Sequence, residues 1–196
     1  MQNNFVQGKN TTLSKLDKSS KKSWDKKIIG LCDKINSLEN YYTTSSCSGR
    51  VVLIVDNAKK GPGLFVKVWH ELINLEELKN ELDTLRAYPE TSSKKMFTKG
   101  IIFKQEPVIL HVACESLEDA LSFLKKARTI GFKRGGIISG GKRFVLELIG
   151  TEKLELPIIK EGRILVDDKF LRLIVKKSNE NLKKSWKRIE KLNNIL

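Results

Sequence analysis

A ten-residue stretch, YYTTSSCSGR, concentrates side chains that could bind a small polar ligand. Ser45, Ser46 and Ser48 supply hydroxyl donors and acceptors, and Gly49 lets a ligand approach the backbone closely. Arg50 adds a permanent charge whose planar fork suits a carboxylate or a phosphate. A well-capped turn would use the same residue types. We expect these five residues to hold an anionic group of a ligand.

Three groups further along the chain could move a proton during a reaction. Histidine titrates near neutral pH, so His70 and His111 are candidates, and Glu106 offers a carboxylate acceptor. Trp69 presents a flat face on which a nucleobase could stack. The alternatives are a core tryptophan, histidines satisfied by local hydrogen bonds, and an ion pair between Glu106 and Lys104.

The cysteines carry less information about chemistry. Cys47, His70, His111 and Cys114 are of the types that bind zinc, but their spacing does not match a zinc finger. The three cysteines, with Cys32 as the third, are too scattered for a disulfide framework, which favours a reducing compartment. We therefore expect no metal.

The charge of the chain favours a polyanionic partner. Its 37 basic and 23 acidic residues leave a formal net charge of +14, and such an excess promotes association with nucleic acid. Surface lysines that only keep a protein soluble would give the same excess. The candidate RNA contacts are Lys104, Lys133, Arg134 and Arg143.

Hydrophobic patterns predict the elements that position these residues. Apolar residues at helical spacing predict an amphipathic helix over 11–39, which could break near Ser19 and Ser20. A loop over 40–50 and a buried strand over 51–55 follow. The other predicted strands are 64–69, 100–104, 108–113, 143–149, 155–159 and 163–166. The other predicted helices are 75–86, one that Ser116 caps, and 169–192.

The helix that Ser116 caps has the clearest boundaries. Asp119 stands three residues after the cap, as in a capping box, and Gly131 ends the helix. A glycine-rich turn over 133–142 follows. The predicted buried residues of this helix are Ala120, Leu121, Leu124 and Ala127.

Short connections between the strands predict an α+β fold with a largely antiparallel sheet and flanking helices. A chain of 196 residues, 40% of them hydrophobic, fits one domain over residues 1–196. Its parts would be an N-terminal helix over 11–39, a β/α core over 41–167, and a basic C-terminal helix over 168–196.

Other architectures fit less well. A Rossmann-type methyltransferase places a glycine-rich loop between a strand and a helix, whereas glycines 135–141 lie between a helix and a strand. No stretch approaches the roughly 20 apolar residues of a membrane span, and no signal peptide is evident, so we expect a cytoplasmic protein. Residues 48–53 resemble 141–146, which indicates either an internal duplication or recurrent strand-entry chemistry.

Several motifs resemble the tRNA wybutosine-synthesizing protein 3 family. They are YTTSSCSGR ahead of an apolar strand, WH at Trp69, and FKQEPVILHV, which contains Glu106 and His111. The first and third are specific, and the resemblance covers nearly the whole chain. It implies transfer of a methyl group from S-adenosylmethionine to N4 of the tricyclic base beside the anticodon of phenylalanine tRNA.

The resemblance also implies roles for the candidate residues. The Ser-rich stretch from Ser45 to Arg50 would bind the cofactor, His70, Glu106 and His111 would be catalytic, and Trp69 and the basic residues would contact tRNA. All would converge on one basic cleft of a monomer or weak oligomer. The alternative function is a non-catalytic basic RNA-binding module.

Overall fold

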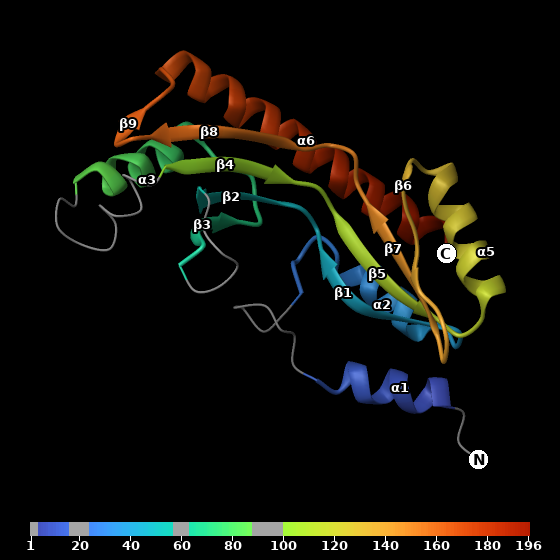
Figure 1. Ribbon diagram of the computed structural model, residues 1–196. Coiled ribbons are helices and arrows are strands. Elements are labelled where there is room, and N and C mark those ends of the chain that lie inside the picture. Colours follow the sequence, from blue (N-terminus) through green and yellow to red (C-terminus); the bar gives the residue numbers. More distant parts are fainter. Residues whose placement is uncertain (1–3, 16–23, 57–62, 88–99) are drawn as a thin grey trace. The chain divides into compact units, whose positions relative to one another are not determined.

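The computed structural model describes residues 4–15, 24–56, 63–87 and 100–196 (Figure 1). Its helices are α1 (Asn4–Leu13), α2 (Ile29–Ser37), α3 (Leu75–Ala87), α5 (Leu117–Thr129) and α6 (Asp168–Ile195). Its strands are β1 (Tyr41–Cys47), β2 (Arg50–Val55), β3 (Phe65–Trp69), β4 (Ile101–Glu106), β5 (Ile109–Cys114), β6 (Arg134–Ser139), β7 (Phe144–Ile149), β8 (Leu154–Lys160) and β9 (Arg163–Ile164).

The strands form two sheets, one ordered β1-β5-β7-β6 and the other β3-β2-β4-β8-β9. Every strand pair among the described residues is antiparallel. The predicted α+β class is therefore confirmed, and the described sheets are not of the Rossmann type. An internal duplication is not confirmed.

The chain divides into two compact units, each containing one sheet. The first unit comprises Met1–Gly49, Pro107–Thr151 and Lys184–Leu196, and the second comprises Arg50–Glu106 and Glu152–Lys183. The interpretation of residues 1–196 as a single domain stays a prediction.

The first unit packs helices on one face of its four-stranded sheet. Alternate residues of β5 and β7, among them Leu110, Val112 and Leu148, join a buried cluster with residues of α2, α5 and the end of α6. On the opposite face, the ring of Phe5 from α1 lies 5.1 Å from the ring of Tyr42, measured between centroids. Because side chains alternate along a strand, polar residues between the core positions face away from the buried cluster.

Buried amide groups organise the second unit. The Gln105 side chain donates hydrogen bonds to the backbone oxygens of Glu106 (3.0 Å) and Glu152 (3.2 Å) and accepts one from Asn181 of α6 (2.7 Å). Asn179, also on α6, accepts a bond from the Ile73 amide (3.1 Å) and donates one to the Ile73 carbonyl (2.7 Å). These bonds tie α6 to β4 and to the segment before α3, since an unpaired buried amide would cost about 1–3 kcal/mol.

The prediction of one continuous helix over 11–39 is wrong, and the alternative of a break near Ser19 and Ser20 falls on residues outside the described part of the chain. Helix α1 ends at Leu13, α2 begins at Ile29, and residues 24–28 are not α-helical. Residues 16–23 lie outside the described part of the chain. The apolar spacing that predicted one helix is divided between two, and Ile28 and Leu31 belong to the buried cluster of the first unit.

Two predicted loops are strands. The expected loop over 40–50 contains β1, whose backbone pairs with β5, because residues at half-exposed strand positions can be polar. The expected glycine-rich turn over 133–142 contains β6, an edge strand of its sheet, where glycine is better tolerated than in a central strand.

The prediction for the capped helix is confirmed except at one position. Ser116 and Asp119 form the capping box of α5, and Ala120, Leu124 and Ala127 are buried, but Leu121 is 52% exposed. Burial opposes ionisation of the Asp119 carboxyl, yet the hydrogen bonds that it accepts from Ser116 and Asn40 outweigh burial and hold its pKa below the ordinary value.

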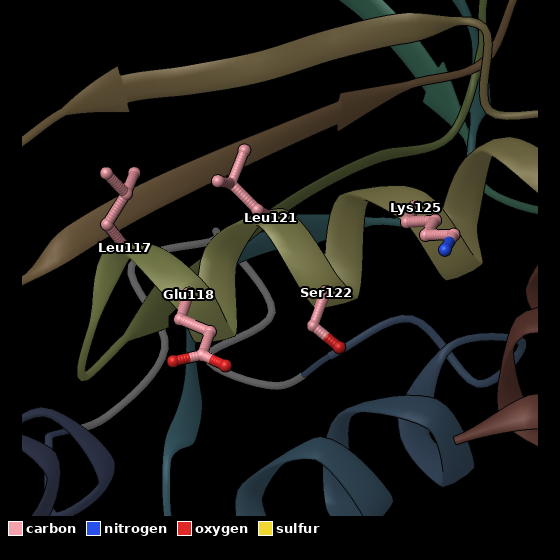
Figure 2. A pocket seen from close by; sticks show the side chains of 5 residues that line it. All are labelled: Leu117, Glu118, Leu121, Ser122 and Lys125. Atoms are coloured by element: carbon pink, nitrogen blue, oxygen red, sulfur yellow. The ribbon is translucent and has the colours of Figure 1, made fainter.

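The exposed face of α5 carries a shallow surface hollow lined by Leu117, Glu118, Leu121, Ser122 and Lys125 (Figure 2). The two leucine side chains point to one side, and Glu118 and Ser122 point to the other. None of the predicted site residues lines this hollow. Among the described helices, none is both long and apolar enough to cross a membrane.

Candidate functional site

A polar row crosses the sheet of the first unit on the face away from its buried cluster. Ser45 of β1 stands opposite His111 of β5, His111 stands opposite Glu147 of β7, and Glu147 stands opposite Gly136 of β6. Directly opposed residues of antiparallel strands point to the same face. One row therefore brings together a hydroxyl, an imidazole and a carboxylate, and ends at a residue without a side chain.

The centre of this row is an imidazole–carboxylate pair. Nε2 of His111 lies 2.8 Å from Oε2 of Glu147, and both side chains are partly exposed. When Glu147 is ionised, Nε2 carries the proton that it donates, which leaves Nδ1 of the neutral ring as a proton acceptor. The pair can therefore accept a proton while the carboxylate fixes the ring.

An irregularity in β1 places Ser45 in this row. The register with β5 shifts between Thr43 and Ser45, so Thr44 is an extra residue. Thr43 lies opposite Val112, a core position, whereas Ser45 lies opposite His111. If Thr44 paired regularly with His111, Ser45 would follow on the core face opposite Leu110, so the bulge places Ser45 opposite His111 instead.

Gly136, which ends the row, and Gly135 before it differ in whether the backbone requires glycine. Gly135 has φ +145°, and a Cβ there would lie 2.3 Å from the backbone oxygen of Glu147, so the strand itself needs glycine. A Cβ on Gly136 would meet nothing within 4 Å. The backbone does not require glycine at 136, and its absence of a side chain leaves space beside Glu147.

The remaining predicted cofactor residues of the first unit lie in different environments. Ser46 stands opposite Leu110 on the core side, and its buried hydroxyl has no hydrogen-bond partner among the described residues. Ser48 is fully buried, and its amide and hydroxyl both donate to Oδ2 of Asp25, at 2.8 and 3.1 Å. Gly49 has φ +98°, a conformation that favours glycine. Ser48 and Gly49 therefore shape the turn after β1.

In the second unit, Arg50 and Glu106 form a similar pair across β2 and β4. Nε of Arg50 lies 2.6 Å from Oε2 of Glu106, and the guanidinium carbon lies 5.1 Å from the ring centroid of Phe65. Phe65 is 45% exposed. The carboxylate and the ring hold the guanidinium from two sides, and only one of its nitrogens takes part in the ion pair.

The other predicted site residues of this unit also lie at strand positions or ends. Lys104 pairs with Glu155 at 2.7 Å, so the alternative of an ion pair between Lys104 and Glu106 is wrong. Trp69 ends β3 half-buried, with the Lys67 ammonium 5.8 Å from its ring. His70 follows directly and is half-buried.

Among the predicted basic contacts in the first unit, Arg143 packs against another side chain, whereas Lys133 and Arg134 are exposed to solvent. Arg143 donates a hydrogen bond to the Tyr42 hydroxyl, and its guanidinium carbon lies 5.5 Å from that ring. Lys133 and Arg134 are exposed. Arg134 stands opposite Ile149, which places it on the same sheet face as Glu147. The prediction that residues of both units share one basic cleft stays a prediction.

Cys114, one of the four residues of a type that can bind zinc, belongs to the hydrophobic core. Cys114 is buried, and burial raises the pKa of its thiol to about 12. It stands on the core face of β5, opposite to the face of His111. Cys114 therefore acts as a small hydrophobic residue of the first unit.

Four residues that belong to these arrangements were not among the sequence candidates: Asp25, Phe65, Gly136 and Glu147. Glu147 carries a visible signal, because it is the one charged residue in the apolar strand FVLELI. A buried-strand pattern interrupted by a carboxylate indicates a partner on a neighbouring strand. The other three are apparent only from the partners that the fold supplies.

The fold and the site define an α+β protein with an acid–base pair on the sheet face opposite its main buried cluster, unlike the Rossmann-type methyltransferases. The model of the family described as Methyltransferase TYW3 matches residues 7–196. The chain therefore belongs to this methyltransferase family.

Curated relatives and a solved structure agree with this assignment. A relative from Methanocaldococcus jannaschii, "tRNA(Phe) 7-((3-amino-3-carboxypropyl)-4-demethylwyosine(37)-N(4))-methyltransferase", is 34% identical over 186 residues, covering 92% of this chain and 91% of the relative. The tRNA wybutosine-synthesizing protein 3 homolog of Danio rerio is 32% identical over 98% of this chain and 74% of its own. The PH1069 protein from Pyrococcus horikoshii superposes with a TM-score of 0.83 at 30% identity, covering 98% and 95% of the two chains.

Proposed function

We propose that this protein transfers a methyl group from S-adenosylmethionine to N4 of the tricyclic base, carrying a 3-amino-3-carboxypropyl group, in phenylalanine tRNA. Membership of the methyltransferase family supports the reaction class, and the printed name of the archaeal relative supplies the substrate. The observation that carries the proposal is the in-register row of Ser45, His111 and Glu147, whose imidazole and carboxylate are partly exposed on one sheet face.

The His111–Glu147 pair has the chemistry that this reaction requires. S-adenosylmethionine, when bound, supplies a methyl group on a positively charged sulfur, which keeps the electron pair of the broken bond. The lone pair of the base nitrogen forms the new N–C bond, so a proton must leave that nitrogen. Nδ1 of His111 accepts it, while Glu147 holds the ring through Nε2. His111 is thus the catalytic residue and Glu147 the positioning residue.

The residues of the second unit provide binding groups. Arg50, held by Glu106 and Phe65, presents a fixed positive charge for a carboxylate or a phosphate. In this assignment Glu106 positions Arg50 and is not the proton acceptor. Trp69 and His70 bind the base, and Lys104 contributes charge toward the RNA. In the first unit, Lys133, Arg134 and Arg143 contribute further charge. Ser45 contacts the ligand directly, whereas Ser46, Ser48 and Gly49 maintain the strand and turn that present it.

A single experiment tests the reaction. Purified protein is incubated with S-adenosylmethionine carrying a labelled methyl group and with phenylalanine tRNA whose tricyclic base lacks the N4 methyl group. Label should appear in that base and in no other nucleotide after digestion. The same tRNA with an unmodified guanosine at this position is the matched control substrate.

The outcomes separate the two candidate functions. Transfer by the native protein and loss of transfer in His111→Ala, with tRNA binding retained, support the proposal. No transfer by the native protein, together with salt-dependent tRNA binding, would overturn it in favour of a non-catalytic RNA-binding module.

A further inference from the structure

The space beside Gly136 is bordered by charges of opposite sign. Gly136 stands opposite Glu147, and Arg134, two residues earlier on β6, stands opposite Ile149 on the same face. No partner of the Arg134 guanidinium is found among the described residues, and a Cβ at 136 would meet nothing within 4 Å. The open position above Gly136 is therefore bordered by the carboxylate of Glu147 and the exposed guanidinium of Arg134.

We propose that Arg134, Gly136 and Glu147 form a subsite for the zwitterionic α-amino-acid group of a ligand. The ligand carboxylate pairs with Arg134, because a guanidinium fork matches a carboxylate. The ligand ammonium pairs with Glu147, whose carboxylate can accept several hydrogen bonds besides that of His111. Gly136 admits the carbon chain between these two charges.

The position of this subsite relative to His111 suits a group that is bound but does not react. Strands β5, β7 and β6 are consecutive in the sheet, and neighbouring strands lie about 4.8 Å apart, so Gly136 is roughly 10 Å from the backbone of His111. A ligand can place its reacting atom at His111 and a charged tail over Gly136, and binding at a remote group of this kind orients the reacting centre.

This inference rests on the proposed function, in which two molecules carry the same group. S-adenosylmethionine has a 3-amino-3-carboxypropyl group on its sulfur, and the base named in the archaeal relative has one on its ring. The chemistry that the subsite recognises is identical in both. The source is therefore distinguished by experiment.

Two variants test the subsite. Gly136→Leu fills the open position, and Arg134→Gln removes the charge at an exposed residue, so it tests the subsite even if leucine at 136 disturbs the sheet. Gly30→Leu in α2 is the matched control, because a Cβ there also meets nothing within 4 Å. Melting temperatures of all variants report folding.

The first arm is calorimetric titration of S-adenosylmethionine and of 5′-methylthioadenosine, which lacks the aminocarboxypropyl group. The second compares tRNA binding with the tricyclic base bearing or lacking that group. If the donor occupies the subsite, both variants weaken S-adenosylmethionine about tenfold or more and leave 5′-methylthioadenosine unchanged. If the tRNA base occupies it, the preference for the side-chain-bearing base falls about tenfold while donor affinity is unchanged.

Unchanged affinities in both arms for Gly136→Leu and Arg134→Gln, in protein that still methylates tRNA, would overturn the subsite and leave the proposed function intact. Equal weakening of S-adenosylmethionine and 5′-methylthioadenosine would also overturn it, because the aminocarboxypropyl group would then not be the group recognised. Absence of methyl transfer by the native protein would instead contradict the proposed function itself.

Discussion

The two units present the same arrangement with different chemistry. In the first unit His111 and Glu147 face each other across β5 and β7, and in the second Arg50 and Glu106 face each other across β2 and β4. Each pair joins a nitrogen and a carboxylate oxygen, at 2.8 Å and 2.6 Å. An imidazole can give up and accept a proton near neutral pH, whereas a guanidinium stays charged.

This difference assigns different tasks to two similar pairs. The imidazole pair suits proton transfer, since its state can change during a reaction. The arginine pair suits binding, since its charge is constant, and its contact with the Phe65 ring restricts the guanidinium further. The cross-strand positions and the nitrogen–oxygen distances of the two pairs are alike, so the type of basic side chain, and not the geometry, distinguishes their roles.

Loss of the imidazole should have the largest effect. His111→Ala removes the proton acceptor, so we expect kcat for methyl transfer to fall about 10²–10⁴-fold, with little change in tRNA affinity measured by filter binding. Ile109→Ala, on the same strand and face, is the control and should retain most activity. Equal losses in both variants would show that the strand is fragile and that the comparison between the pairs does not hold.

Removal of the charge from Glu147 should have the next largest effect. Glu147→Gln keeps the shape of the side chain but no longer fixes the tautomer of His111, so kcat should fall about tenfold or more. Loss of the pair with the ligand ammonium should raise KM as well. Single-turnover and steady-state kinetics separate the two quantities. A rise in KM with kcat unchanged would place Glu147 in ligand binding alone.

In the second unit, the conservative variant Arg50→Lys should affect binding more than chemistry. A lysine cannot pair with Glu106 and also present a planar fork, so KM should rise about tenfold. Lys104→Arg, which can keep the pair with Glu155, is the control. A fall in kcat equal to that of His111→Ala would show that the arginine pair belongs to the chemical step.

A third carboxylate, Asp119, should affect stability alone and by the smallest amount. Its pKa is held below 3.8 in the folded chain, so its stabilisation is present above pH 3.8 and is lost as the pH falls through the folded value. We expect the native protein to lose more stability between pH 5 and pH 2 than Asp119→Asn does, by a small amount because the carboxyl is partly exposed to solvent.

Urea unfolding at several pH values measures this difference. Glu118→Gln, an exposed change one residue earlier in α5, is the control. The same pH dependence in Asp119→Asn and native protein would contradict the stabilising role of the capping box, and loss of methyl transfer in Asp119→Asn would contradict the assignment of this carboxylate to structure.

Local patterns predicted much of the fold. The apolar strand 51–55 and the capping box of Ser116 and Asp119 are visible in a few adjacent residues, and the structure shows both. The prediction that Leu121 is buried is wrong, because helical spacing defines the buried face of a helix only approximately. In the structure it lies on the exposed side of α5.

The polar row could be predicted only in part. His111 stood out as an ionisable residue, but its partner Glu147 lies 36 positions later, and strand register over such a distance is not encoded in any short motif. Ser-rich β1 was interpreted as a loop because hydroxyl side chains favour turns. The difference between Gly135 and Gly136 depends on which backbone atoms lie nearby, and that information exists only after folding.

The bulge at Thr44 is part of the specification of the site. Side chains of a strand alternate between its faces, so regular pairing of Thr44 with His111 would move Ser45 to the core position opposite Leu110. Deletion of Thr44 would instead leave Ser45 opposite His111, in a strand without the bulge. The way in which this segment pairs, and not only its composition, therefore decides whether the hydroxyl beside the imidazole belongs to a threonine or to a serine.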